Sequence, residues 1–313
     1  MTTVERLDNW KRAGIITDAQ YGLLAALVRR ERFSLFLEIN ALLYLGVLAL
    51  AGGLAWTFTT YFQRLGDFFI LAALSALLAG SLYYCFSRTP AYSNEEVESP
   101  NVVFDYILYF ACLVLSVELG YIEFRFEWLR DAWNNYLLFS SVVFFVLAYR
   151  FDNRFVLSLA LSSLGGWFGV QFSISRFNSP ASLRAAAFVY SFLIVLIGGF
   201  LHRQGIKKHF LETYLHIAAT VSFVALVSGL ADNNGKLFLL ALLLMSAACV
   251  VLGLRFKRFM FVVYGIGFGY IGVSYQMLRN VNEFASDLTY FVVTGSGVIF
   301  LVILLARRFG REE

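Results

Sequence analysis

Five polar side chains lie inside, or just inside, long apolar stretches of this sequence. A charged group in hydrocarbon is costly, so an ionisable residue in such a place is a functional candidate. We therefore treat these five as candidate polar or pathway residues for an ion, a proton or a small solute. They are Glu38, Asp105, Glu118, Glu212 and His216.

Three of these carboxylates, Glu38, Asp105 and Glu212, lie near the start of an apolar stretch. Each is about one helical turn, or roughly 5 Å, inside the apparent boundary. They could form a ring at a cytoplasmic vestibule that binds a cation or relays protons. Alternatively, water and the flexible side chains of lysine and arginine reach this depth and solvate them. The shallow position favours the second interpretation.

His209, Glu212 and His216 are spaced to lie along one stripe of a helix. A glutamate and a histidine four residues apart can share a metal when other helices supply further ligands. However, His209 and His216 are roughly 10 Å apart along the helix axis, and the chain has only 3 histidines. We expect a hydrogen-bonded seam between helices, with no metal and no cofactor.

Glu118 lies close to the opposite boundary of its apolar stretch, as do Gln171 and Gln276. Either these side chains line an outward-facing pocket, or they mark where the membrane ends. Both interpretations remain open at this point.

Two apolar stretches are rich in glycine. Gly265 and Gly269, four residues apart, form a face that allows another helix backbone to approach closely. Gly166 and Gly169 are three residues apart in an earlier stretch. Unwound, substrate-coordinating helices of transporters also contain such glycines, but helix packing is the commoner cause.

We expect no enzymatic activity, since the sequence lacks a serine–histidine–acid grouping, a zinc-protease helix, paired catalytic aspartates and a Walker loop. The 3 cysteines, Cys85, Cys112 and Cys249, each occur singly within an apolar stretch. Without a pairing motif they indicate small buried hydrophobic residues.

The elements that must position these residues are membrane-spanning helices. The chain has 313 residues, of which 59% are hydrophobic and 15% charged, whereas a soluble protein has about 25% charged residues. Apolar stretches of about 20 residues match the bilayer thickness. We predict an all-α, polytopic bundle of about ten helices in residues 34–306. The predicted spans are 35–58, 67–87, 102–121, 133–149, 154–171, 181–201, 209–230, 236–254, 259–278 and 288–306.

Charge predicts the orientation of these spans. With the N-terminus inside, most of the 25 lysines and arginines fall in cytoplasmic segments. This is the expected distribution, because positively charged loops are retained on the cytoplasmic side of the membrane. Both termini are then cytoplasmic, including the tail 307–313. The net charge of +4 is scattered along the chain, which argues against nucleic acid as a partner. The loop 88–101, with 3 glutamates and 2 prolines, is expected to be flexible.

Residues 1–33 are polar and predict a cytoplasmic amphipathic helix pair. Gly14 would end the first helix, and Thr17 would cap the second. Trp10 and Gly14 are candidate partner-binding residues on this pair, and the partner would be a cytoplasmic protein. The sequence does not specify an oligomeric state.

A parallel internal repeat of four helices is a further hypothesis, with copies at 102–205 and 207–310. In the first copy Asn134-Asn135 precedes an apolar stretch that ends at Arg150-Phe151, and in the second Asn233-Asn234 precedes one that ends at Arg255-Phe256. Chance similarity between apolar sequences is the alternative.

The opening residues resemble the bacterial family called domain of unknown function 2157. That family begins with a helix pair of the pattern Leu-x-x-Trp-x-x-x-Gly-hydrophobic-Ile/Leu-Thr-x-x-Gln, followed by several membrane spans. The matching positions here are Leu7, Trp10, Gly14, Ile16, Thr17 and Gln20. The resemblance implies a bacterial inner-membrane protein without an assigned activity, and it transfers no catalytic residues.

Three functional hypotheses follow for a protein embedded in the lipid bilayer. The first is a transporter-like or channel-like protein for a small solute or ion. The second is a membrane-anchored interaction or sensing protein that acts through residues 1–33. A third, an intramembrane enzyme acting on lipid, would require Glu212 and His216 to converge on one cavity with Glu118 or Asp105.

Overall fold

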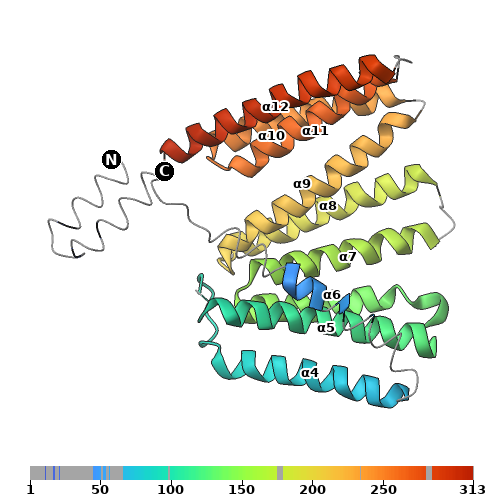
Figure 1. The fold of residues 1–313 in the computed structure, drawn as a ribbon, viewed down its shortest axis with the longest axis vertical. Coiled ribbons are helices and arrows are strands. Elements are labelled where there is room, and N and C mark those ends of the chain that lie inside the picture. The colour runs from blue at the N-terminus through green and yellow to red at the C-terminus, as the bar shows by residue number, and fades with distance from the viewer. Residues whose placement is uncertain are drawn as a thin grey trace. The chain divides into compact units, whose positions relative to one another are not determined.

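The computed structural model describes residues 66–97, 99–174, 179–232, 234–279 and 284–312, together with 11, 17, 21, 45–50, 52, 53 and 56. Across these residues every regular element is a helix, as the ribbon in Figure 1 shows. The all-α fold expected from the sequence is therefore confirmed.

Nine long helices account for most of the described chain. Their bounds are α4 Asp67–Arg88, α5 Val102–Phe126, α6 Asn135–Phe151, α7 Arg154–Ile174, α8 Pro180–Arg203, α9 Leu211–Ser228, α10 Gly235–Arg255, α11 Phe259–Leu278 and α12 Phe284–Glu312. There are also short 3-10 turns: η2 Arg130–Ala132 comes before α6, η3 Lys208–Phe210 directly precedes α9, and η4 Gly229–Ala231 directly follows α9. Within the described part, eight helical segments are long and apolar enough to cross a membrane, and α6 is a shorter apolar helix of 17 residues.

The helix starts follow local capping chemistry. Asn101 accepts a hydrogen bond from the Phe104 amide at 2.7 Å, which satisfies one of the free amides at the start of α5. Ser179 and Ser182 form a reciprocal capping box before α8, and Pro180 is the first residue of that helix. Because it is the first residue, this proline starts the helix and does not kink it.

The chain divides into two compact units, residues 43–235 and residues 236–313 with 1–42. In the first unit, α4 packs against α5, α6 against α7, and α8 against both α7 and α9. Successive helices run in opposite directions, so the connections gather at two ends (Figure 1). We call the end with connections 89–101, 152–153 and 204–210 the Asp152 end, and the other the Asp67 end.

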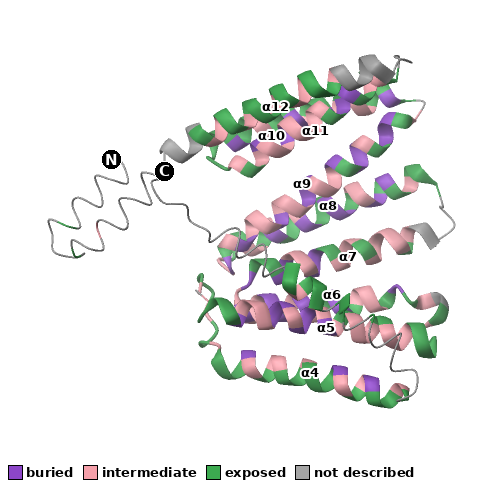
Figure 2. Ribbon diagram, in the orientation of Figure 1, coloured by how far each residue is buried: buried purple, intermediate pink, exposed green. Residues whose placement is uncertain are grey.

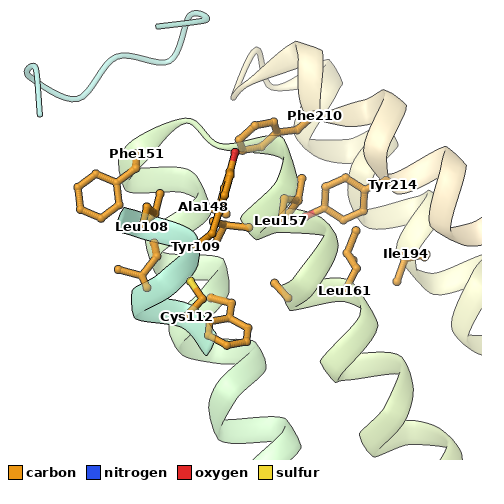
Figure 3. Close-up of a cluster of buried hydrophobic side chains, with 14 of the residues drawn as sticks. Leu108, Tyr109, Cys112, Ala148, Phe151, Leu157, Leu161, Ile194, Phe210 and Tyr214 are labelled. Carbon is orange, nitrogen blue, oxygen red and sulfur yellow. The ribbon is translucent and has the colours of Figure 1, made fainter. Parts of the chain in front are cut away.

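The largest buried cluster of the first unit lies toward the Asp152 end. Phe104, Leu108, Leu157 and Phe210, from α5, α7 and the turn before α9, are at most 1% exposed. Figure 3 shows side chains of this cluster converging from these helices. Burial of this kind stabilises a helical bundle by close packing of its side chains.

Large apolar side chains also cover the outer surface of the helices. On α4, Phe68 is 83% and Tyr83 77% exposed, and much of this helix is exposed or intermediate in Figure 2. A soluble surface would not present so many apolar groups in succession. These faces suit contact with lipid hydrocarbon.

Glycines bring α10 and α11 close together in the second unit. A Cβ atom added to Gly265 would lie 2.5 Å from the carbonyl oxygen of Ser246, and one on Gly269 would lie 3.4 Å from the Ser246 side chain. The face expected at Gly265 and Gly269 therefore contacts a neighbouring helix. A Cβ on Gly267 would meet nothing within 4 Å.

The turns α6–α7 and α10–α11 have the same backbone form. Asp152 and Lys257 both have positive φ, 55° and 56°, and the next amide, of Asn153 or Arg258, donates to a carbonyl five residues earlier. This is the Schellman form of helix ending. The two turns are 105 residues apart, the separation that the repeat hypothesis requires, and the repeat itself stays a prediction.

Three described residues belong to the predicted N-terminal helix pair. The Tyr21 amide donates to the Thr17 carbonyl at 2.8 Å, the bond expected of a helix that begins at Thr17. The Lys11 ammonium lies 4.8 Å from the centre of the Tyr21 ring. Trp10, Gly14, Glu38 and most of the span 35–58 lie outside the described residues.

Replacing Gly265 by alanine should destabilise the protein. The added methyl would overlap the Ser246 carbonyl, and overpacking of this kind costs about 1–3 kcal/mol. Gly267→Ala, in the same helix, is the matched control and should be neutral or slightly stabilising, by up to ~1 kcal/mol. Thermal unfolding of both purified variants in detergent measures the difference. Equal stability of the two variants would contradict the packing described here.

Candidate functional site

Asp152 is the centre of a buried polar network at the Asp152 end. Its side chain is 3% exposed, and it occupies the left-handed turn between α6 and α7. One carboxylate oxygen lies 2.6 Å from Nε2 of His209. The other lies 2.9 Å from Nζ of Lys207 and accepts the Val97 amide at 2.5 Å. Three segments far apart in sequence thus meet at one carboxylate.

Lys207 ties the connection between α4 and α5 to the start of α9. Its side chain is 2% exposed, and its ammonium donates to the Glu95 carbonyl at 3.0 Å. Its own amide donates to the Asn94 carbonyl at 3.0 Å, and its ammonium lies 5.5 Å from the Tyr92 ring centre. These bonds hold the described residues of the loop 89–101 against the helix ends.

The described residues of this loop make further hydrogen bonds, and the expectation that the loop is flexible stays a prediction. Arg150 donates to the Pro90 carbonyl at 3.2 Å, and Ser99 donates to Asp105 at 2.8 Å. The glutamate- and proline-rich composition suggested flexibility, and the structure adds that several backbone groups of the loop bond to charged residues of other segments. Tertiary partners of this kind cannot be read from the composition of the loop.

Asp105 also lies at the Asp152 end. Its carboxylate accepts hydrogen bonds from the Ser99 hydroxyl and from the side-chain amide of Asn153, the latter at 2.9 Å. Asn153 also donates to the Tyr109 hydroxyl at 3.1 Å. The carboxylate thus joins α5 to the α6–α7 turn.

Glu212 lies at the same end of the unit with different partners. One carboxylate oxygen is 3.8 Å from Nη1 of Arg154, and the other is 3.7 Å from Nε2 of His216. Arg154 also donates to Glu96 at 2.6 Å. Of the stripe of three, His209 therefore faces Asp152, while His216 faces Glu212. The described residues contain no group of three or more side chains suited to hold a metal ion.

Glu118 and Gln171, toward the Asp67 end, have separate partners. Glu118 accepts a hydrogen bond from Ser75 of α4. Gln171 accepts one at 2.8 Å from Asn134, which precedes α6. Gln276 is in α11, in the other unit. Neither Glu118 nor Gln171 lines either of the two hollows described below.

Sequence reasoning missed three charged residues that the fold buries. Asp152 and Lys207 fell in short connections, and Arg184, which is 7% exposed, fell inside the predicted span 181–201 without being singled out. Arg184 lies in α8 and forms an ion pair with Asp232. The available signal was the brevity of the connections, because a charge between two adjacent spans has little room to avoid the neighbouring turns.

Two hollows lined by described residues of the first unit are large enough to hold a small molecule. One, of about 330 Å³, lies between α7, α8 and α9 and is mostly apolar, with Gly165, Gly169 and Ala187 in its wall. The other, of about 400 Å³, lies between the second half of α5, the first half of α6 and α7. We call the latter the Glu123 hollow. Around Asp152 the corresponding space is only about 10 Å³.

Repeated apolar helices and lipid-suited surfaces define a multi-pass helical membrane protein. Residues 8–157 match the family model described as predicted membrane protein (DUF2157). The resemblance indicated by the opening residues is thereby confirmed. No curated protein and no solved structure matches the chain.

Replacing Asp152 by asparagine should strongly destabilise the protein. The change leaves the Lys207 ammonium buried without its carboxylate, and breaking a buried ion pair on one side costs about 3–5 kcal/mol. Glu96→Gln is the control, because it breaks an ion pair with Arg154 whose members are 60% and 46% exposed. Such a surface pair contributes about 0–1 kcal/mol. Denaturant unfolding should separate the variants, and similar losses from both would refute the network's role.

Proposed function

We propose that this chain is a membrane-anchored interaction or sensing protein, in which the helical bundle holds a cytoplasmic helix pair at the bilayer. The observation that supports this most is the separation of the candidate carboxylates. Asp105 and Glu212 lie at one end of the first unit and Glu118 nearer the other, each bound to a different neighbour. A transport pathway would instead favour polar groups that share one cavity.

A rigid cytoplasmic end suits an anchoring role. The Asp152 network fixes the loop 89–101, the α6–α7 turn and the start of α9 relative to one another. Buried, fully bonded polar networks favour one arrangement over alternatives.

The proposal includes the topology, with the Asp152 end and both termini in the cytoplasm of a bacterial cell. Arg88, Arg150, Arg154, Arg203 and Lys208 all belong to this end. Positive residues are retained on the cytoplasmic side of the inner membrane. The supporting argument is thus the charge asymmetry between the two ends of the described bundle.

A photo-crosslinking amino acid at position 11 should yield a discrete adduct with a cytoplasmic protein in cells. Lys11 is exposed and belongs to the proposed docking pair. Position 127 is the matched control, since Glu127 is also exposed but follows α5 at the Asp67 end. Gel shifts followed by mass spectrometry identify the adducts. The proposal fails if position 11 gives none, or if position 127 gives the same one.

Transport is a second candidate, favoured by one observation. The Glu123 hollow contains a carboxylate and hydroxyl groups and lies toward the Asp67 end, whereas the Asp152 end leaves only about 10 Å³. A transporter closed on one side would have this asymmetry.

Flux measurements in proteoliposomes separate the two candidates. If the chain anchors a partner, we expect no proton or potassium flux above that of empty liposomes. Glu123→Gln provides the internal test, because a flux that this substitution abolishes would establish transport and overturn the anchoring proposal. A flux unchanged by the substitution would point to leakage of the vesicles.

A further inference from the structure

The Glu123 hollow has the composition of a binding site and not that of a packing defect. Its volume of about 400 Å³ falls within the range of about 300–1,000 Å³ typical of small-molecule pockets. Polar side chains enter it from three helices. They are Ser116 and Glu123 of α5, Tyr136 and Ser140 of α6, and Ser163 of α7.

The hollow is negatively charged. Glu123 is the one charged residue among those that line it. Its Oε2 accepts the Leu129 amide at 3.0 Å, which holds the carboxylate in place. The nearby Arg125 is engaged elsewhere, since its Nε lies 2.8 Å from Asp67. A cation is therefore the charge-complementary occupant.

One hydroxyl in the wall lies close to the Glu123 carboxylate. The Tyr136 oxygen is fully buried and makes no well-formed hydrogen bond among the described residues, while Glu123 is near enough to interact with it. A buried polar group that is incompletely bonded costs free energy, and a ligand that bonds to it recovers that cost. The phenol oxygen is suited to accept from an N–H group. Ser116, by contrast, donates to the Cys112 carbonyl at 3.1 Å.

Aromatic rings stand at the edge of the hollow. Trp133 is 45% and Phe124 78% exposed, and both line it. Tryptophan and phenylalanine faces attract ammonium groups, and aromatic cages around a carboxylate are used to bind quaternary ammonium. A single carboxylate without histidine or cysteine is, in contrast, a poor ligand set for a transition metal.

We propose that the Glu123 hollow binds an ammonium group, with Glu123 as its counter-ion, Tyr136 as a hydrogen-bond partner and Trp133 as an aromatic wall. The ammonium belongs either to a free organic cation or to the head group of a zwitterionic lipid. The position supports both sources, because Glu123 and Trp133 flank helix ends, where lipid head groups lie. The inference does not depend on the anchoring role.

Methylammonium chloride, whose ammonium group has N–H donors, is titrated into protein in phosphatidylglycerol nanodiscs to test the free-cation source. We expect a saturable change in tryptophan fluorescence relative to sodium chloride at equal ionic strength. The change should disappear in Trp133→Phe, and Glu123→Gln should weaken binding at least tenfold. Glu127→Gln, an exposed glutamate that does not line the hollow, should bind as the unmodified protein does.

Native mass spectrometry of protein from mixed phosphatidylethanolamine and phosphatidylglycerol nanodiscs tests the lipid source. Retention of phosphatidylethanolamine that Glu123→Gln removes and Glu127→Gln preserves would support it. If Glu123→Gln does not fold, Tyr136→Phe replaces it, with weaker binding again expected. The inference is overturned if neither ammonium compound binds, or if both bind equally well to Glu123→Gln and Tyr136→Phe.

Discussion

The ion pair between Asp152 and Lys207 is the interaction on which the described first unit most depends. Both side chains are at least 97% buried, and a buried charge is tolerated only when it is paired and hydrogen-bonded. Asp152 is therefore also bonded to the Val97 amide and His209, and Lys207 to the Glu95 carbonyl. The left-handed backbone of both charged residues places them in tight turns, where their side chains can meet.

The Asp152 end is closed by polar bonds, and the two hollows described above lie elsewhere in the first unit. The helices pack closely around Phe104, Leu157 and Phe210 beside the network, and the Glu123 hollow lies toward the opposite end. A structure closed at one end and hollow toward the other suits a protein that binds a ligand on one side of a bilayer. The same asymmetry links the proposed ammonium site with the proposed cytoplasmic anchoring surface.

The fold was largely predictable from the sequence because apolar length alone specifies a membrane helix, and the described helices follow the predicted spans from residue 67 onward. The site was less predictable. Depth within a span identified Asp105, Glu118 and Glu212, but their partners Asn153, Ser75 and Arg154 come from distant segments. Asp152, Lys207 and the Glu123 hollow escaped notice because burial at a turn, or a space between helices, depends on how the helices pack. The shortness of the connections was the one hint at Asp152 and Lys207, and local pattern gives none for a space between helices.

A double-mutant cycle on Asp152 and Lys207 tests the central claim most directly. The account predicts that Asp152→Asn and Lys207→Met are each strongly destabilising, because each leaves one buried charge unpaired. The double variant, which leaves neither charge, should then be considerably more stable than the sum of the two losses implies. Denaturant unfolding in detergent supplies the free energies. Strictly additive losses would contradict the account, because they would mean that the two side chains do not interact.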